Sequence, residues 1–242
     1  MDLDGQRVVV LGGTSGFGLA TAAEAGGAGA RVIVVSRQQS SVQKALAALP
    51  AGTDGRAVDL TNQDAVTRLF AEITVDGGID HLVYTAGEAL AVSNLDTLDL
   101  AVARQFFETR YFGALWAVHA AAPHMRPGSS ITLTSGGAGR RPLPGWSVVS
   151  SICGAMESLT RALSVELAPI RVNAVSAGVI RSPLWDPLPD AAREQLYRST
   201  AERMPVGRVG EVDDIARAFL FLMTEGFATG TILTVDGGAA LV

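Results

Sequence analysis

The sequence predicts a single α/β domain with a doubly wound, seven-stranded parallel sheet and helices on both faces. Seven apolar, β-branched runs alternate along the chain with longer segments of helical period. The runs lack polar alternation, so both faces of each strand are expected to be buried, as in a parallel sheet covered on each side. The length of 242 residues suits one such domain with a sizeable core.

Each apolar run is expected to form one strand. In chain order the runs are RVVVLG from Arg7, RVIVVS from Arg31, GRAVDL from Gly55, DHLVYTAG from Asp80, SITLTS from Ser130, RVNAVSAG from Arg171 and TILTVDGG from Thr231. Six crossovers join them into a Rossmann-type sheet. Two long helices are expected around residues 98–122 and 147–168.

Composition excludes several classes of protein. The net charge of −5 and the lack of a Lys/Arg block argue against a nucleic-acid binder. The amino terminus MDLDGQRVVV does not resemble a signal peptide, and no apolar run approaches the roughly 18 residues of a membrane span. Lys44 is the only lysine among 19 basic residues, which we attribute to a GC-rich, bacterial genome.

The cysteine and histidine content argues against disulfides and metals. Cys153 is the only cysteine, which excludes an internal disulfide and fits a cytoplasmic protein. The three histidines have no ligand spacing; they are His81, His119 and His124. We therefore expect no metal site.

Residues 181–210 are rich in proline and charge and lie between the sixth strand and the last helix. Long insertions beyond the carboxyl end of a strand commonly cover a ligand in such sheets. This segment is predicted to form a substrate lid within the domain.

A glycine-rich motif, LGGTSGFGLA, follows the first strand and opens a helix. Its glycines, Gly12, Gly16 and Gly18, allow a tight turn, so that a pyrophosphate can approach the unpaired N–H groups at the positive end of the helix. The alternative is a turn whose glycines serve only strand–helix packing.

Together with later segments, this motif resembles the short-chain dehydrogenase/reductase family over essentially the whole chain. VDL, YTAG and VNAVSAGVIRSPL are similar to three further family segments, although Leu11 stands where threonine is usual and Ala177 replaces a proline. The resemblance implies a dinucleotide site formed by Gly12, Thr14, Ser15, Gly16, Phe17, Gly18, Asp59, Leu60, Ala86, Gly87, Gly178, Ile180 and Ser182.

The second strand indicates the type of dinucleotide. It ends in Ser36 and Arg37 rather than in a carboxylate. A carboxylate there would bond the 2′-hydroxyl of NAD(H), whereas a small polar residue followed by arginine admits and neutralises the 2′-phosphate of NADP(H). NADP(H) is therefore favoured over NAD(H). The alternatives are a solvated Arg37 and a protein that binds no dinucleotide.

The family pattern also implies a catalytic serine, a Tyr-x-x-x-Lys pair and an asparagine. Ser135 matches the serine, but the tyrosine position is Val149, the lysine position is Cys153 and the asparagine position is Arg110. The phenol of the pair normally exchanges a proton with the substrate oxygen, and such catalysis contributes about 10²–10⁴ in rate. Neither valine nor cysteine reproduces the pair, so ordinary ketone reduction is predicted to be weak or absent.

Each possible replacement has an alternative interpretation. Arg110 could return a cation to the nicotinamide ribose or the substrate oxygen, or it could form a salt bridge. Cys153 could be a nucleophile, but a small buried filler is favoured because no activating base is identifiable. Trp146 and Trp185 could line an apolar substrate pocket or belong to the core.

Two functions remain open from the sequence. The first is an oxidoreductase with altered chemistry: substrate-assisted proton transfer, reduction of an activated C=C or C=N bond, or a non-redox reaction in the same pocket. The second is an inactive dinucleotide- or small-molecule-binding pseudoenzyme that acts as a structural or regulatory partner. The resemblance further implies a homodimer or homotetramer built from the two long helices around residues 98–122 and 147–168, and the aromatic lining suggests an apolar small molecule as the ligand.

Overall fold

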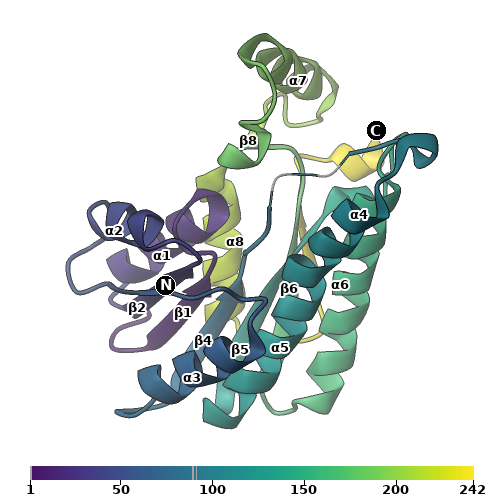
Figure 1. The fold of residues 1–242 in the computed structure, drawn as a ribbon. Coiled ribbons are helices and arrows are strands. Elements are labelled where there is room, and N and C mark those ends of the chain that lie inside the picture. Colours follow the sequence, from purple (N-terminus) through teal and green to yellow (C-terminus); the bar gives the residue numbers. More distant parts are fainter. Residues whose placement is uncertain (1, 89, 91) are drawn as a thin grey trace.

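The computed structural model describes residues 2–88, 90 and 92–242. Its centre is a parallel seven-stranded sheet with the strand order β3-β2-β1-β4-β5-β6-β9 (Figure 1). The strands are β1 (Arg7–Leu11), β2 (Arg31–Ser36), β3 (Asp54–Ala57), β4 (Ile79–Tyr84), β5 (Met125–Gly136), β6 (Arg171–Ala177) and β9 (Ile232–Val235). The prediction of one doubly wound, Rossmann-type sheet is confirmed.

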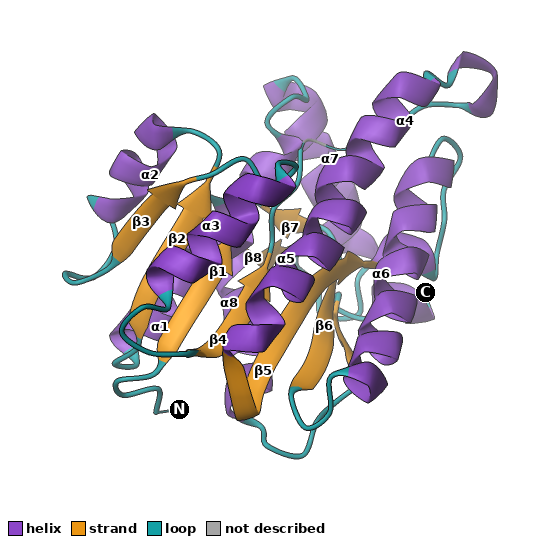
Figure 2. Ribbon diagram, turned by 60° about the horizontal axis from the view of Figure 1, so that its bottom comes forward, coloured by secondary structure: helices purple, strands orange, loops and turns teal. Residues whose placement is uncertain are grey.

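Helices cover both faces of this sheet (Figure 2). One face carries α3 (Gln63–Ile73), α4 (Leu100–Phe107), α5 (Gly113–Ala121) and α6 (Ser147–Glu166). The other carries α1 (Gly16–Gly27), α2 (Gln39–Leu46) and α8 (Val212–Thr224). No described helix is both long and apolar enough to cross a lipid bilayer.

The alternation of side chains along each strand divides the core into two clusters. Val9 and Leu11 of β1 belong to the cluster under α3, α5 and α6, whereas Val8 and Val10 belong to the cluster under α1 and α8. All four side chains are fully buried. Successive strand residues point to opposite faces, so an uninterrupted apolar run feeds both clusters.

The helix expected around residues 98–122 is interrupted. A π-helical segment, Glu108–Phe112, lies between α4 and α5. The hydroxyl of Tyr84, at the end of β4, donates to the main-chain oxygen of Thr109, with 2.5 Å between the two oxygens. A side chain that inserts into the helical hydrogen-bond ladder widens it locally. The helix expected around 147–168 forms as α6.

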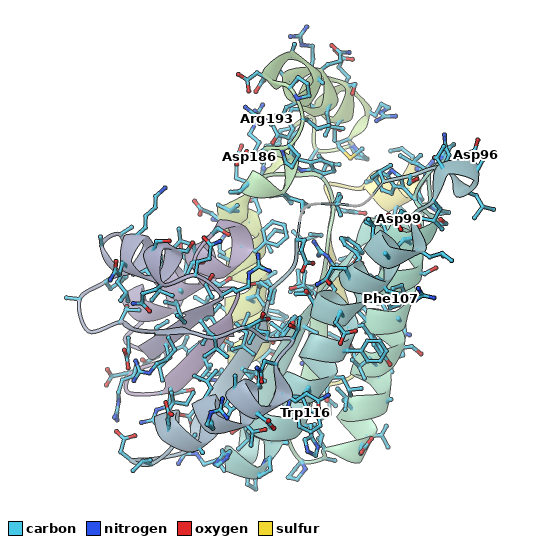
Figure 3. The ribbon with its side chains drawn as sticks, in the orientation of Figure 1. Asp96, Asp99, Phe107, Trp116, Asp186 and Arg193 are labelled. Carbon is cyan, nitrogen blue, oxygen red and sulfur yellow. The ribbon has the colours of Figure 1, made fainter. Side chains whose placement is uncertain are left out.

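The segment predicted as a lid begins and ends in a small second sheet. β7 (Ile180–Arg181) pairs in parallel with β8 (Gly210–Glu211), and α7 (Asp190–Arg203) stands between them in sequence, away from the main sheet (Figure 1). One ion pair ties α7 to the preceding turn, with Arg193 3.7 Å from Asp186, and a second lies within the helix, with Arg193 2.7 Å from Asp190. Figure 3 labels Asp186 and Arg193 beside this helix.

Candidate active site

Two adjoining cavities open at the carboxyl ends of the central strands. A cleft of about 340 Å³ lies over the turn that follows β1, and a chamber of about 520 Å³ lies between β5, α6 and the segment 181–210. The two cavities share six lining residues: Phe17, Thr85, Ala86, Arg110, Thr134 and Leu184. Ligands bind at this edge in open α/β sheets. The arrangement therefore suits two ligands, one in each cavity, that contact each other where the cavities adjoin.

The glycine-rich turn is shaped by close packing. Gly12 has a φ of +88°, and a Cβ there would lie 2.5 Å from the main-chain nitrogen of Ala86. A Cβ on Gly18 would lie 2.3 Å from the main-chain oxygen of Gly12. Only glycine fits at either position. The turn therefore lies directly against the end of β4 and leaves the amino terminus of α1 facing the cleft, with the Ser15 hydroxyl unused as a cap.

Most residues that the sequence analysis assigned to the dinucleotide line this cleft. They are Gly12, Thr14, Ser15, Gly16, Phe17, Ser36, Arg37, Asp59, Leu60, Ala86, Gly87 and Ser182. Gly18, Gly178 and Ile180 lie outside its lining. Gly18 serves the packing just described, Gly178 lines the chamber instead, and the main-chain oxygen of Ile180 accepts a hydrogen bond from the Trp185 indole at 3.0 Å.

The polar groups of the cleft fit a phosphorylated dinucleotide. Asp59 accepts hydrogen bonds from the main-chain nitrogen and the hydroxyl of Thr61, at 3.0 and 2.8 Å, and these bonds lower the pKa of its carboxyl group. Arg37 is exposed and forms no ion pair with any described residue. The Ser182 hydroxyl is buried and has no partner among the described residues. Both groups are therefore available to a ligand.

Arg110 lies in the wall between the two cavities. It belongs to the π-helical segment, and its guanidinium carbon lies 4.4 Å from the centre of the Phe106 ring. Its Nη2 donates to the main-chain oxygen of Glu88, while its Nε is buried with no partner in the described part of the chain. A Cβ on Gly87 would lie 2.4 Å from its guanidinium carbon. No described carboxylate lies within ion-pair distance of it, so part of its donor capacity is unused.

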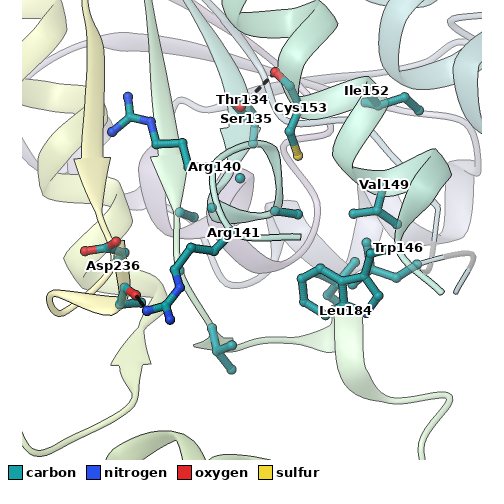
Figure 4. Close-up of a pocket in the computed structure, with 18 of the residues that line it drawn as sticks. Thr134, Ser135, Arg140, Arg141, Trp146, Val149, Ile152, Cys153, Leu184 and Asp236 are labelled. Carbon is teal, nitrogen blue, oxygen red and sulfur yellow. Dashed lines mark hydrogen bonds between the residues drawn. The ribbon is translucent and has the colours of Figure 1, made fainter. Parts of the chain in front are cut away.

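Ser135, Val149 and Cys153 meet at the chamber (Figure 4). The Ser135 hydroxyl donates to the main-chain oxygen of Cys153, with 3.2 Å between the oxygens. Val149 and Cys153, one turn apart on α6, are 5% and 8% exposed. Burial raises the pKa of the Cys153 thiol, although hydrogen bonds from the main chain of Gly136 and Gly139 oppose that shift. The thiol is therefore protonated at neutral pH.

No tyrosine replaces the missing phenol in the described chamber. Tyr84 lines it, but its hydroxyl is already bonded to Thr109, and burial raises the pKa of Tyr84 far above its ordinary value. Tyr111 and Tyr197 are not among the described lining residues, and Tyr197 packs under Arg181, whose guanidinium carbon lies 4.3 Å from the ring centre.

The chamber is largely apolar, and both predicted tryptophans line it. Trp146 and Trp185 are joined by aliphatic and aromatic residues from α4, α6, the segment 181–210 and the loops after β4 and before α6: Leu90, Phe106, Leu143, Ile152, Met156, Leu184 and Met204. The sequence did not predict its charged rim of Arg140, Arg141, Arg203 and Asp236. These residues come from three distant segments, so no local pattern marks them; the pair Arg140–Arg141 just after a strand was the only signal.

Comparisons with known proteins agree with the resemblance. A family model described as enoyl-(acyl carrier protein) reductase matches residues 12–240. The chain is 38% identical to "Short-chain dehydrogenase/reductase ATR9" from Stachybotrys chlorohalonatus, with 98% of each chain covered. Because this relative is fungal, the bacterial source inferred from composition stays a prediction.

Solved structures show the same likeness. A small-chain dehydrogenase in complex with NADPH is 35% identical, with a TM-score of 0.87 over 99% of this chain and 100% of that one. The MalC reductase/Diels-Alderase from Malbranchea aurantiaca is 29% identical, with a TM-score of 0.92 over 99% of this chain and 98% of that one.

Proposed function

The chain belongs to the short-chain dehydrogenase/reductase family of oxidoreductases, and from that premise we propose that it binds NADP(H) in the cleft and reduces an activated double bond in the chamber. The observation that carries this proposal is the position of Arg110, a cation with unused donors in the wall between the cavities, beside a site where Val149 and Cys153 supply neither the phenol nor the ammonium of the family pair. A structural neighbour that binds NADPH supports the choice of dinucleotide.

The residues of the cleft would hold the dinucleotide as follows. The turn at Gly12 and the amino terminus of α1 would receive the pyrophosphate, Arg37 would neutralise the 2′-phosphate, and Ser182 would bond the carboxamide. When bound, NADPH supplies a hydride to an electrophilic carbon. The unused N–H groups and the buried hydroxyl described above are the groups that such a ligand would satisfy.

The missing acid determines which acceptor is favoured. A plain ketone that accepts a hydride becomes an alkoxide, a strong base that needs a proton at once. An enone that accepts a hydride at its β-carbon instead becomes an enolate, whose oxygen is a much weaker base. Arg110 can stabilise that oxygen by charge and hydrogen bonding without giving up a proton. Water then protonates the carbon after release, and the enone is reduced to a saturated ketone.

The segment 181–210 would cover the chamber during this reaction. Leu184, Trp185 and Met204 of that segment line the chamber, and the segment starts and ends at the β7–β8 pair. Exclusion of water by such a lid strengthens the interaction between Arg110 and a negative oxygen, because screening is weaker in a dry site.

A pseudoenzyme is the second candidate, and the Ser135–Cys153 hydrogen bond favours it. The one family catalytic residue that is retained donates to helix α6 rather than toward the chamber. In that case the protein would bind NADP(H) and a small molecule without turnover, as a structural or regulatory partner.

A binding and single-turnover experiment separates these functions. NADPH fluorescence titration measures cofactor binding, and the oxidation of bound NADPH is then followed with cyclohexanone, 2-cyclohexenone and a cyclic imine. We expect oxidation by the enone and not by the ketone, and a loss of about 10²–10³ in that rate in Arg110→Met. The matched control is Arg104→Met, an exposed arginine of α4 outside both cavities.

Binding of NADPH without oxidation by any of the three acceptors would contradict the proposed reduction and support the pseudoenzyme. An enone rate that is unchanged in Arg110→Met would remove Arg110 from the chemistry.

A further inference from the structure

The charged side chains of the chamber are mostly positive. Its described lining contains Arg110 in the wall toward the cleft, Arg140 and Arg141 after β5, and Arg203 at the end of α7, but only one acidic side chain, Asp236. The whole chain has a net charge of −5. The positive rim is therefore a local feature of this cavity and not a property of the surface in general.

Arg110 aside, two of these arginines have no charged partner among the described residues. Arg140 lies 3.8 Å from Glu157, but neither Arg141 nor Arg203 lies within 4.0 Å of a carboxylate in the described part of the chain. Each is instead held by one bond to the main chain: Arg141 Nη1 donates to the oxygen of Ala239 at 2.9 Å, and Arg203 Nε donates to the oxygen of Ser199 at 3.0 Å. Their remaining N–H groups are free to bind an anion.

Asp236 forms no ion pair with any described arginine of this rim. Its two carboxylate oxygens accept hydrogen bonds from the main-chain nitrogens of Gly238 and Ala240, at 2.9 and 3.0 Å. The carboxylate therefore stabilises the turn that leads into the last residues, close to Arg141 in Figure 4.

Hydrogen bonds join the three segments that carry Arg141, Arg203 and Asp236. The main-chain nitrogen of Val206, just after α7, donates to the oxygen of Gly237 at 3.3 Å, and Arg141 bonds the same carboxyl-terminal segment at Ala239. Arg203 and Thr200 lie on one face of α7, three residues apart. Thr200 lines the chamber, is 3% exposed, and its hydroxyl has no partner among the described residues.

We propose that the chamber binds an apolar molecule that carries a carboxylate. The apolar part lies against Trp146 and Trp185, and the carboxylate is bound by Arg141 and Arg203 at the rim, with the Thr200 hydroxyl as a further donor. Arginine forks match the planar carboxylate group, and the aromatic lining matches a flat apolar body. The inference rests on the proposed function in one respect: this molecule is taken to be the substrate of the proposed reduction.

The test compares a carboxylic acid with the corresponding uncharged amide. The Kd values of 2-naphthaleneacetic acid and of its primary amide are measured by calorimetry on the protein saturated with NADP⁺. We expect the acid to bind about tenfold more tightly than the amide, as charge-assisted hydrogen bonds imply. Arg141→Gln and Arg203→Gln should each raise the Kd of the acid by a similar factor and leave the Kd of the amide unchanged.

Arg198→Gln is the matched control, because Arg198 is an exposed arginine of α7 that lies outside the chamber lining and forms no ion pair with a described residue. It should bind the acid as the unmodified protein does. Three results would overturn the inference: equal affinity for acid and amide, no binding of either, or a loss of acid affinity in Arg198→Gln as large as in the rim variants.

The outcome is separable from that of the proposed function. Acid selectivity without enone reduction would contradict only the proposed reaction, and enone reduction without acid selectivity would contradict only the carboxylate site.

Discussion

Ser135 donates its hydroxyl hydrogen to the main-chain oxygen of Cys153, 3.2 Å away. This bond joins the end of β5 to α6 at the point where relatives are expected to hold a lysine. Val149 lies one turn earlier on the same face of α6, and both side chains are buried. The chamber therefore has a serine directed at a helix, an isopropyl group and a protonated thiol where a proton-transfer relay is expected.

The thiol of Cys153 should react slowly. Burial raises its pKa, and the thiolate is the reactive form. Incubation of the native protein with a disulfide reagent at pH 7.5 should leave the thiol intact, whereas the protein unfolded in urea should react completely. Rapid stoichiometric modification of the native protein would contradict this description of the site.

Arg37 should determine the preference between the two dinucleotides. Replacement of Arg37 by glutamine removes a charged hydrogen bond worth about 1.5–3 kcal/mol, so the Kd for NADPH should rise by at least about tenfold while that for NADH stays the same. Fluorescence titration measures both values. Lys44→Gln, which changes an exposed cation of α2 outside the cleft, is the control; an equal loss there would indicate a non-specific effect of charge.

His81 should make the protein less stable in mild acid. Its ring nitrogens lie 2.8 Å from the Ser130 hydroxyl and 2.6 Å from the Gln6 side-chain oxygen, and burial lowers its pKa from 6.5 to about 4. Because Gln6 presents an oxygen, the neutral ring carries its hydrogen on Nε2 and accepts from Ser130 at Nδ1.

Between pH 6.5 and about 4 the unfolded chain binds a proton at His81 that the folded chain does not bind. The free energy of unfolding should therefore fall by about 3 kcal/mol as the pH falls through this window, and this group should contribute no pH dependence above it. Urea unfolding at several pH values measures the slope. His81→Gln should lose that slope and His119→Gln should keep it; a slope that survives in His81→Gln would refute the assignment.

The α4–α5 surface should form a subunit interface. Val102, Phe112 and Leu115 are 50%, 51% and 36% exposed there, and Figure 3 shows Phe107 and Trp116 on the same helices. We expect a homodimer or homotetramer by light scattering, and a smaller particle for Phe112→Asp. Val75→Asp, at an 85% exposed position after α3, should not change the mass. A monomeric unmodified protein would contradict the prediction.

The sequence predicted the sheet and those cleft residues whose place follows from their position relative to a strand. The apolar runs became the sheet, and Ser36, Asp59 and Ala86 line the cleft because each ends or follows a strand at the same edge of the parallel sheet. The π-helical segment was not predictable, since helical period persists through Glu108–Phe112 and the hydroxyl that widens it belongs to Tyr84, on another element. The arginine rim was missed for the same reason: its members are brought together only by tertiary packing.

The most direct measurement is the single-turnover rate of cyclohexanone reduction by NADPH-loaded protein, unmodified and with Val149→Tyr and Cys153→Lys together. The two changes place a phenol and an ammonium one helical turn apart on α6. We predict no reduction above background in the unmodified protein and a gain of about 10²–10⁴ in the double variant. Brisk ketone reduction by the unmodified protein, with no gain in the double variant, would contradict the conclusion that Val149 and Cys153 do not take over the work of a phenol and an ammonium.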